Sequence, residues 1–106
     1  MAQIGIFTKN SDGSYTGEII TLSVQATNVR ITPEENRLND NAPTHRITVG
    51  RAEIGAGWSK RSNEGRDYLG LKFDDPSFTA PIYANLFDEA DGQSASLIWS
   101  RQRSRD

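Results

Sequence analysis

The sequence contains no cysteine and a single histidine, His45. Without cysteine the chain cannot form a disulfide, use a thiolate nucleophile, or bind zinc or an iron–sulfur cluster through sulfur. A small secreted domain without disulfides would depend on its core alone, so we expect a reducing, cytoplasmic location. The chain also lacks any apolar run near the ~20 residues that span a bilayer, and no signal-peptide pattern is visible. A membrane role is therefore not expected.

The single histidine narrows the catalytic options. His45 is in period-2 phase with Ile47 and Val49 of a predicted strand. There is no cysteine for it to activate, and no serine lies in a Gly-x-Ser-x-Gly elbow. We therefore expect a half-buried or strand-edge histidine and no enzyme, with a hydrolase that uses His45 as a third alternative behind the two binding hypotheses given below.

Acidic residues occur in short clusters at predicted turns: Glu34-Glu35, Asp74-Asp75 and Asp88 to Asp91. Neighbouring residues of a strand point to opposite faces, so adjacent carboxylates cannot face each other across a cleft, as glycosidase chemistry needs. A calcium-binding loop around Gly92 would place Phe87 at its first ligand position, and one around Gly13 would place Ile19 at its twelfth. Neither side chain has an oxygen atom that could bind calcium. We expect solvated turn carboxylates, no metal and no cofactor.

Strand patterns dominate the 106 residues, which suffice for one domain. Apolar residues alternate with polar ones, and turn signals at Asn10–Gly13, Ser62–Gly65 and Asp88–Gly92 punctuate the alternation. The fold class we predict is all-β (mostly β): an antiparallel meander closing into a small barrel or sandwich. At most one short helical turn is expected, near Asp75–Phe78.

Within this single domain (residues 1–106) we expect a long polar loop at residues 33–44 and a frayed tail at residues 101–106.

The strand pattern also predicts which residues share a face. Ile4 and Ile6 share one face of the first strand, and Ala52, Ile54, Ala56 and Trp58 line up on one side of a later strand. The small residues between Ile54 and Trp58 would let a neighbouring strand or a large aromatic side chain pack closely.

Aromatic and basic residues concentrate around the hairpin at Ser62–Gly65. They form a candidate binding surface of Trp58, Lys60, Arg61, Arg66, Tyr68 and Lys72. Bases of a single-stranded nucleic acid stack on such aromatic side chains while cations follow the phosphates. Two observations oppose this interpretation: the net charge is −2, and Trp58 is in phase with Ile54, which would make it a core residue.

An antiparallel sheet that does not close has two open edges, and such edges pair with other chains. Self-association through a sheet edge, or strand addition by a partner protein, is therefore expected if the fold is a sandwich.

The sequence also resembles a family catalogued as domain of unknown function 736. The matching stretches span nearly the whole chain: Gln3–Phe7, Thr16–Leu22, Ala42-Pro43, Ile54–Trp58, Gly65–Leu69, Asp74–Phe78, Ala80–Leu86 and Leu97–Arg101. One departure is Thr79, where relatives often carry proline. The resemblance implies a small proteobacterial protein, often encoded on plasmids or integrative elements, with no agreed activity and no functional residues to carry over.

Two function hypotheses follow. The first is a non-enzymatic accessory or protein-interaction module, linked to a mobile genetic element. The alternative is a small β-barrel that binds single-stranded nucleic acid through the candidate binding surface.

Overall fold

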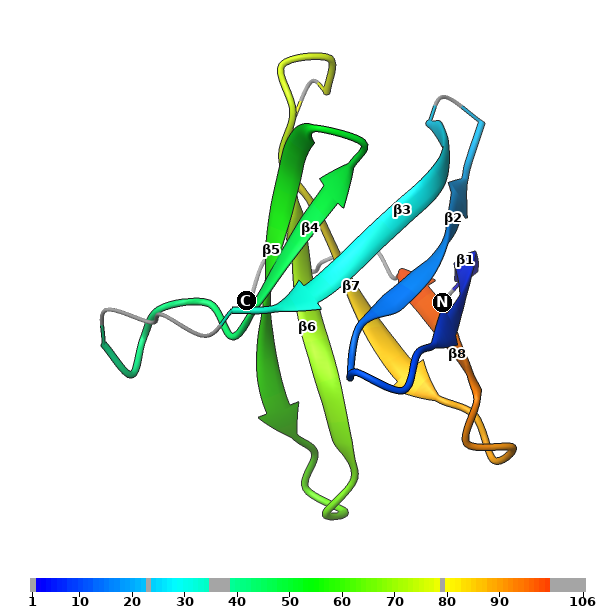
Figure 1. Ribbon diagram of the computed structural model, residues 1–106, viewed down its shortest axis with the longest axis vertical. Helices are drawn as coiled ribbons and strands as arrows, with labels where there is room; N and C mark the ends of the chain where they lie inside the picture. Colours follow the sequence, from blue (N-terminus) through cyan, green and yellow to red (C-terminus); the bar gives the residue numbers. More distant parts are fainter. Residues whose placement is uncertain (1, 23, 35–38, 79, 100–106) are drawn as a thin grey trace, which may run out of the picture.

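In the computed structural model, residues 2–22, 24–34, 39–78 and 80–99 are described, and they form eight β-strands (Figure 1). The strands follow one another along the chain as β1 (Ala2–Lys9), β2 (Tyr15–Ile20), β3 (Gln25–Pro33), β4 (His45–Val49), β5 (Ala52–Arg61), β6 (Asp67–Phe73), β7 (Ile82–Asp88) and β8 (Ser94–Trp99). Each strand is antiparallel to the next, as the predicted meander requires. The predicted all-β fold is confirmed.

The sheet closes into a barrel because β1 pairs with β8 as well as with β2. Gly5 shows the closure at a single residue, since it lies opposite Ile19 of β2 and opposite Leu97 of β8. Of the two predicted architectures, the chain therefore adopts the barrel. Each of the eight described strands has two hydrogen-bonded neighbours. The fold thus does not supply the pair of open edges that a sandwich would offer to a partner.

The hairpin turns lie where the sequence predicts them. Gly13, Gly65 and Gly92 have positive φ angles of 90°, 84° and 74°, a conformation that glycine adopts without steric cost. At 74–78 the chain makes a single turn, in which the Phe78 amide donates to the Asp75 carbonyl at 2.8 Å. The sequence predicts at most one short helical turn here. The described residues contain this single turn and no helix. None of them could therefore cross a membrane as a helix.

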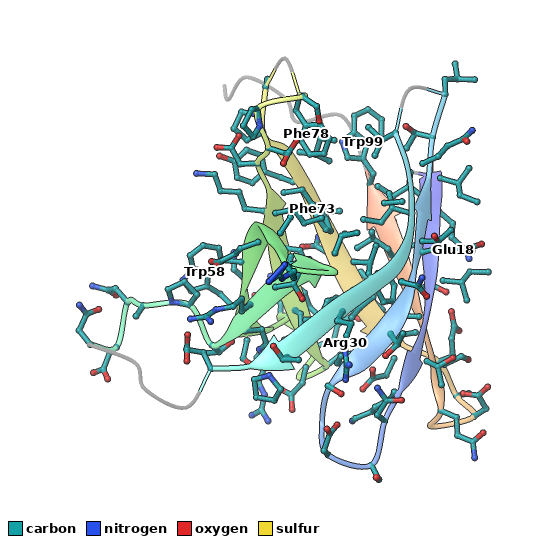
Figure 2. The ribbon with its side chains drawn as sticks, turned by 45° about the horizontal axis from the view of Figure 1, so that its top comes forward. Glu18, Arg30, Trp58, Phe73, Phe78 and Trp99 are labelled. Atoms are coloured by element: carbon teal, nitrogen blue, oxygen red, sulfur yellow. The ribbon has the colours of Figure 1, made fainter. Side chains whose placement is uncertain are left out.

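The barrel interior holds the hydrophobic core. Phe7, Ile31, Ile47 and Leu97 are fully shielded from solvent, and Phe73 projects into the space between the strands (Figure 2). These side chains fill the barrel, so its interior is a packed core and not a channel.

The phase of two strands differs from the prediction. In β1 the inward residues are Gly5 and Phe7, and Ile6 is 58% exposed. The prediction that Ile4 and Ile6 share a face is wrong, because the register of β1 shifts between Gln3 and Gly5. Ile4, in this irregularity, packs against the core.

A similar irregularity changes the phase of β5. Against β4, Ile47 lies opposite Gly55 while Thr48 lies opposite Glu53. This leaves Ile54 as an extra residue, and a β-bulge of this kind reverses which residues face inward. Ile54 is buried, but beyond the bulge Gly57 faces the core, and Trp58 faces outward. The prediction that Trp58 shares a face with Ile54 is therefore wrong.

The predicted loop at residues 33–44 begins at the last residue of β3, Pro33. At its base the Glu34 amide donates to the Thr44 carbonyl at 2.8 Å, and the Ala42 amide donates to the Asn39 carbonyl. Residues 35–38 and the predicted tail at 101–106 lie outside the described residues.

Candidate nucleic-acid interface

Strands β5, β6 and β7 carry a polar and aromatic outer face. Cross-strand pairing sets the outward side chains in rows: Ala56, Lys72 and Tyr83; then Trp58, Gly70 and Asn85; then Lys60 and Tyr68. Residues in such a row are direct neighbours across the sheet. The register thus brings Trp58 and Lys60 of β5 beside Lys72 of β6 and Tyr83 of β7, which are far apart in the sequence.

Gly70 creates a groove in the middle of this face because it contributes no side chain there. The groove has a volume of about 510 Å³, and Trp58, Lys60, Lys72, Tyr83 and Asn85 line it. The three atoms nearest to a methyl group built on Gly70 all belong to the end of the Lys60 side chain, with Lys60 Cε at 3.0 Å. The Lys60 chain therefore lies over the glycine. We call this feature the outer groove.

Trp58 forms one wall of the outer groove. It projects from the outside of β5 (Figure 2), and its indole Nε1 donates to the Asn41 carbonyl at 3.1 Å. Loop residue Thr44 anchors the same region, since its Oγ1 accepts a hydrogen bond from the Ser59 amide at 2.9 Å. These contacts hold the ring half-buried at one edge and leave part of it on the surface. Trp58 is thus an oriented surface aromatic.

Tyr83 and Lys72 form the other side of the groove. The Tyr83 side chain is 49% exposed, and the Lys72 Nζ lies 6.0 Å from its ring centre. Period-2 alternation in β7 accounts for the exposure, because Ala84 and Leu86 face the core. This pattern could have identified Tyr83 and Asn85 as outward residues. The predicted candidate binding surface does not include them, because it comprises only aromatic and basic residues around one hairpin.

The remaining residues of the candidate binding surface lie elsewhere. Tyr68 stacks on Phe87, with ring centres 5.1 Å apart and planes at 28°. The Arg66 guanidinium lies 5.0 Å from the Phe87 ring centre and donates to the Asp88 carbonyl at 2.7 Å. Arg66 and Tyr68 therefore pack against the end of β7, outside the groove. Across the sheet, Tyr68 is paired with Lys60 and not with Trp58.

Arg61 is engaged in an ion pair. Its Nε donates to Asp67 Oδ1 at 2.9 Å, and this hydrogen bond raises the pKa of the Arg61 guanidinium. Alternation along β5 places Arg61 on the opposite side of the strand from Lys60. Of the six predicted residues, the structure brings Trp58, Lys60 and Lys72 together in one groove, and it separates Arg61, Arg66 and Tyr68 from them.

A second hollow lies at one mouth of the barrel. It has a volume of about 700 Å³ and includes Tyr15, His45 and Asp88 in its lining. The Tyr15 hydroxyl donates to Asp88 Oδ1 at 2.9 Å. Burial, followed by this hydrogen bond and the nearby negative charge, raises the pKa of the Tyr15 hydroxyl well above its ordinary value. The bond ties β2 to β7 across the barrel mouth.

His45 lies at the same mouth, at the start of β4. Its Nδ1 is 2.8 Å from Thr44 Oγ1, and burial lowers the pKa of the imidazole. In the described ranges no carboxylate is hydrogen-bonded to this ring, and no group of three or more His, Cys, Asp and Glu side chains could hold a metal ion. The geometry at His45 is thus that of a half-buried strand residue.

Comparison with known proteins identifies one family whose model matches the sequence. A family model described as protein of unknown function (DUF736) matches residues 3–102. No curated protein and no solved structure matches the chain.

Proposed function

Because that match covers nearly the whole chain, the protein belongs to the DUF736 family of proteins of unknown function, and we propose that it binds single-stranded nucleic acid in the outer groove. The observation that carries this proposal is the placement of Trp58 and Tyr83, two partly exposed aromatic rings, on opposite sides of a groove that two lysines border. In this proposal the protein is a binding protein and not an enzyme.

Stacking supplies the affinity for bases. A base that stacks on an aromatic side chain gains about 1–3 kcal/mol, and every base has a face that can stack. The hydrogen bond from Trp58 to the Asn41 carbonyl fixes the indole before a ligand arrives, so little conformational entropy is lost when a base stacks on it. The Lys60 side chain lies over Gly70, so in this proposal a base enters the middle of the groove as that flexible side chain swings aside.

The two lysines supply contacts to the phosphates. Lys60 and Lys72 come from neighbouring strands, and neither forms an ion pair within the described residues. Both charges are thus available to an anionic backbone, whereas Arg61 is already paired with Asp67. Because only two cations take part and the net charge is −2, we expect weak, sequence-tolerant binding with a dissociation constant on the order of 1–100 µM.

The test is fluorescence anisotropy with a labelled 12-nucleotide single strand at several salt concentrations. We expect the affinity to fall with salt, and either Lys60→Ala or Lys72→Ala to reduce the slope of log K against log salt by about 0.7. Tyr83→Ala should weaken binding about 5- to 150-fold through lost stacking, with little effect on the slope.

Arg30→Ala is the matched control for charge. Arg30 is an exposed cation on β3 (Figure 2), two strands away from β5. Its replacement removes one positive charge but should leave both the affinity and the salt slope nearly unchanged. The proposal fails if no binding is detected at low salt, or if Arg30→Ala lowers the affinity as much as Lys60→Ala and Lys72→Ala do.

The family resemblance adds a setting to this proposal. A protein linked to a mobile genetic element in the cytoplasm would meet single-stranded intermediates, because plasmid transfer and replication pass through them. The link is tested by measuring the frequency of plasmid transfer in a strain that carries the double variant Tyr83→Ala/Lys72→Ala.

One separate observation favours the protein-interaction hypothesis. Ile6 and Ile20 are more than half exposed and Leu22 is fully exposed, and exposed apolar side chains mark a contact surface where they form a contiguous patch. Sedimentation velocity over a range of protein concentrations tests self-association. If it occurs through these residues, Leu22→Glu will abolish it and leave nucleic-acid binding intact.

A further inference from the structure

We propose that Leu22 of one copy of this chain inserts into an apolar hollow at the barrel mouth of a second copy, and that the two copies exchange this contact across a two-fold axis. The outer groove takes no part in the contact, so the inference goes beyond the proposed binding of nucleic acid. It rests on the protein-interaction hypothesis and deepens it, because it names the partner and the surface that receives Leu22.

The hollow lies at the end of the barrel opposite the mouth that Tyr15 and Asp88 line, and it has a volume of about 560 Å³. Figure 2 shows Phe78 at this end of the barrel, beyond Phe73. The apolar side chains of its lining are Val24, Ala26, Val49, Ile54, Phe78 and Ile82. All of these except Ile54 are only half-buried, although they pack against the core. The fold thus leaves apolar surface open in this hollow, which we call the apolar mouth.

The two mouths of the barrel differ in their chemistry. At the first mouth the hydrogen bond from Tyr15 to Asp88 and the ion pair between Lys9 and Asp88 join neighbouring walls. In the apolar mouth the Asp75 carboxylate bonds only within its own turn, where its Oδ2 accepts from the Ser77 amide at 3.0 Å and from the Ser77 hydroxyl. Apolar contact is therefore the main interaction that this mouth offers to a partner.

Leu22 is a fully exposed apolar side chain beside the apolar mouth. It lies in the turn between β2 and β3, where the Thr21 amide donates to the Val24 carbonyl at 2.7 Å. Val24, two residues after Leu22, is part of the mouth's lining. Figure 1 shows the β2–β3 turn at the same end of the barrel as the β4–β5 turn. An apolar projection and an apolar hollow thus lie next to each other.

Leucine is an unusual residue for a hairpin turn, because turns favour glycine, asparagine, aspartate, serine and proline. Four other turns follow this preference and contain a glycine with positive φ: Gly13, Gly50, Gly65 and Gly92. Leu22 instead exposes its whole side chain to water. A residue that opposes the local rule without a gain in packing is typical of a functional position.

A second copy of the chain matches both features at once. In a two-fold contact, residue i of each copy meets residue j of the other, so each Leu22 can enter the apolar mouth of its partner. Such a contact closes at two copies and covers both projections and both hollows. The chain's own end offers no alternative, since the residues that follow Trp99 are Ser-Arg-Gln-Arg-Ser-Arg-Asp, with no apolar side chain among them.

The experiment is sedimentation velocity of the full chain at protein concentrations from about 1 µM to about 500 µM, a range that covers weak dimers. We expect the wild type to pass from monomer to dimer with no larger species. Leu22→Ser should weaken dimerisation at least tenfold, because two leucine side chains lose their burial. Ala52→Glu should do the same from the other side of the contact. Ala52 is an exposed residue of the mouth's lining, and leucine would desolvate the new carboxylate.

A mixture of the two variants tests the exchange of contacts directly. The Leu22 side chain of the Ala52→Glu protein can still enter the intact mouth of the Leu22→Ser protein. The mixture should therefore associate more tightly than either variant does alone, and less tightly than the wild type. Urea unfolding of both variants should give the wild-type midpoint, because each substitution is at an exposed position.

Ile6→Ser is the matched control, since Ile6 is also exposed but lies on the outer face of β1. It should leave dimerisation unchanged. The inference is overturned, with self-association itself retained, if Ile6→Ser weakens the dimer as much as Leu22→Ser does, if either Leu22→Ser or Ala52→Glu dimerises like the wild type, or if the mixture gains nothing. A wild type that stays monomeric, or that forms open-ended polymers, would overturn it as well. Neither result would affect the binding of nucleic acid in the outer groove.

Discussion

Gly57 and Gly70 lie beside each other on β5 and β6 but on opposite faces of the sheet. Leu71, the residue paired with Gly57, fills the space inside the barrel: a methyl group on Gly57 would lie 2.6 Å from Leu71 Cδ2. Outside the barrel, Gly70 is paired with Trp58, and the three atoms nearest above it belong to the flexible side chain of Lys60. Each glycine removes a side chain, but one makes room for the core and the other makes a groove.

Glycine thus has two different roles in this barrel, one on the inner face and one on the outer face. A glycine that faces the core allows a large neighbour to pack closely, and the protein interior tolerates little added volume there. Core packing does not explain Gly70 on the outer face, since the atoms nearest to an added methyl group are those of a flexible lysine side chain. We therefore expect substitutions on the inner face to change stability and substitutions on the outer face to change binding.

The largest effect is expected at Gly17. Gly17 lies inside the barrel, and a methyl group there would be 2.6 Å from Phe7 Cγ and 2.7 Å from Phe7 Cα. Because the backbone cannot move aside, Gly17→Ala should lower the free energy of unfolding by about 2–3 kcal/mol, measured by urea unfolding. Gly70→Ala is the control with the same chemical change. If both substitutions destabilise equally, the distinction between the two faces is wrong.

A smaller effect is expected at the barrel mouth, where Tyr15 donates to Asp88. Tyr15→Phe should lower the free energy of unfolding by about 1–2 kcal/mol, because it removes a hydrogen bond to a carboxylate that is itself partly exposed. The raised pKa of Tyr15 also predicts that the contribution of Tyr15 to stability does not change with pH below pH 10 and falls above it, because the fold disfavours the tyrosinate.

Tyr83→Phe is the control for the loss of a hydroxyl group, since Tyr83 lies on the outer face and its hydroxyl has no hydrogen-bond partner in the described part of the chain. It should leave stability unchanged. Should Tyr15→Phe keep the alkaline loss of stability, another group must cause that loss.

The smallest effect on stability is expected from His45. Burial lowers the pKa of the imidazole below its ordinary value of 6.5. The unfolded chain therefore takes up a proton at a higher pH than the folded chain, and stability should decline as the pH falls below 6.5. His45→Gln should flatten this decline between pH 6.5 and pH 5.5 in urea unfolding. A slope that is identical in wild type and variant would show that His45 does not titrate differently in the two states.

Much of the fold could be predicted from the sequence. Turn residues such as Gly13 and Gly65, with alternating strands between them, determine a meander, because each turn conformation joins neighbouring antiparallel strands. Closure into a barrel could not be predicted, because it depends on the pairing of β1 with β8, residues that are about 90 positions apart (Figure 1).

The candidate site was predicted in part. Trp58, Lys60 and Lys72 lie in one groove as the hairpin suggested, but the direction of Trp58 was wrong. Period-2 counting assumes an unbroken ladder, and one extra residue at Ile54 exchanges inside for outside along the rest of β5. Tyr83 enters the groove only through the register between β6 and β7, which no local pattern reveals.

The most direct test of the outer groove as the binding site is to measure both stability and binding affinity in one variant. Gly70→Val fills the outer groove with a side chain that suits a strand, and the three atoms nearest to its Cβ position all belong to the flexible Lys60 side chain. We predict that the urea unfolding midpoint stays within error of the wild type and that affinity for the labelled 12-nucleotide strand falls at least tenfold. Unchanged affinity in a stably folded Gly70→Val protein would contradict the assignment of the outer groove as the binding site.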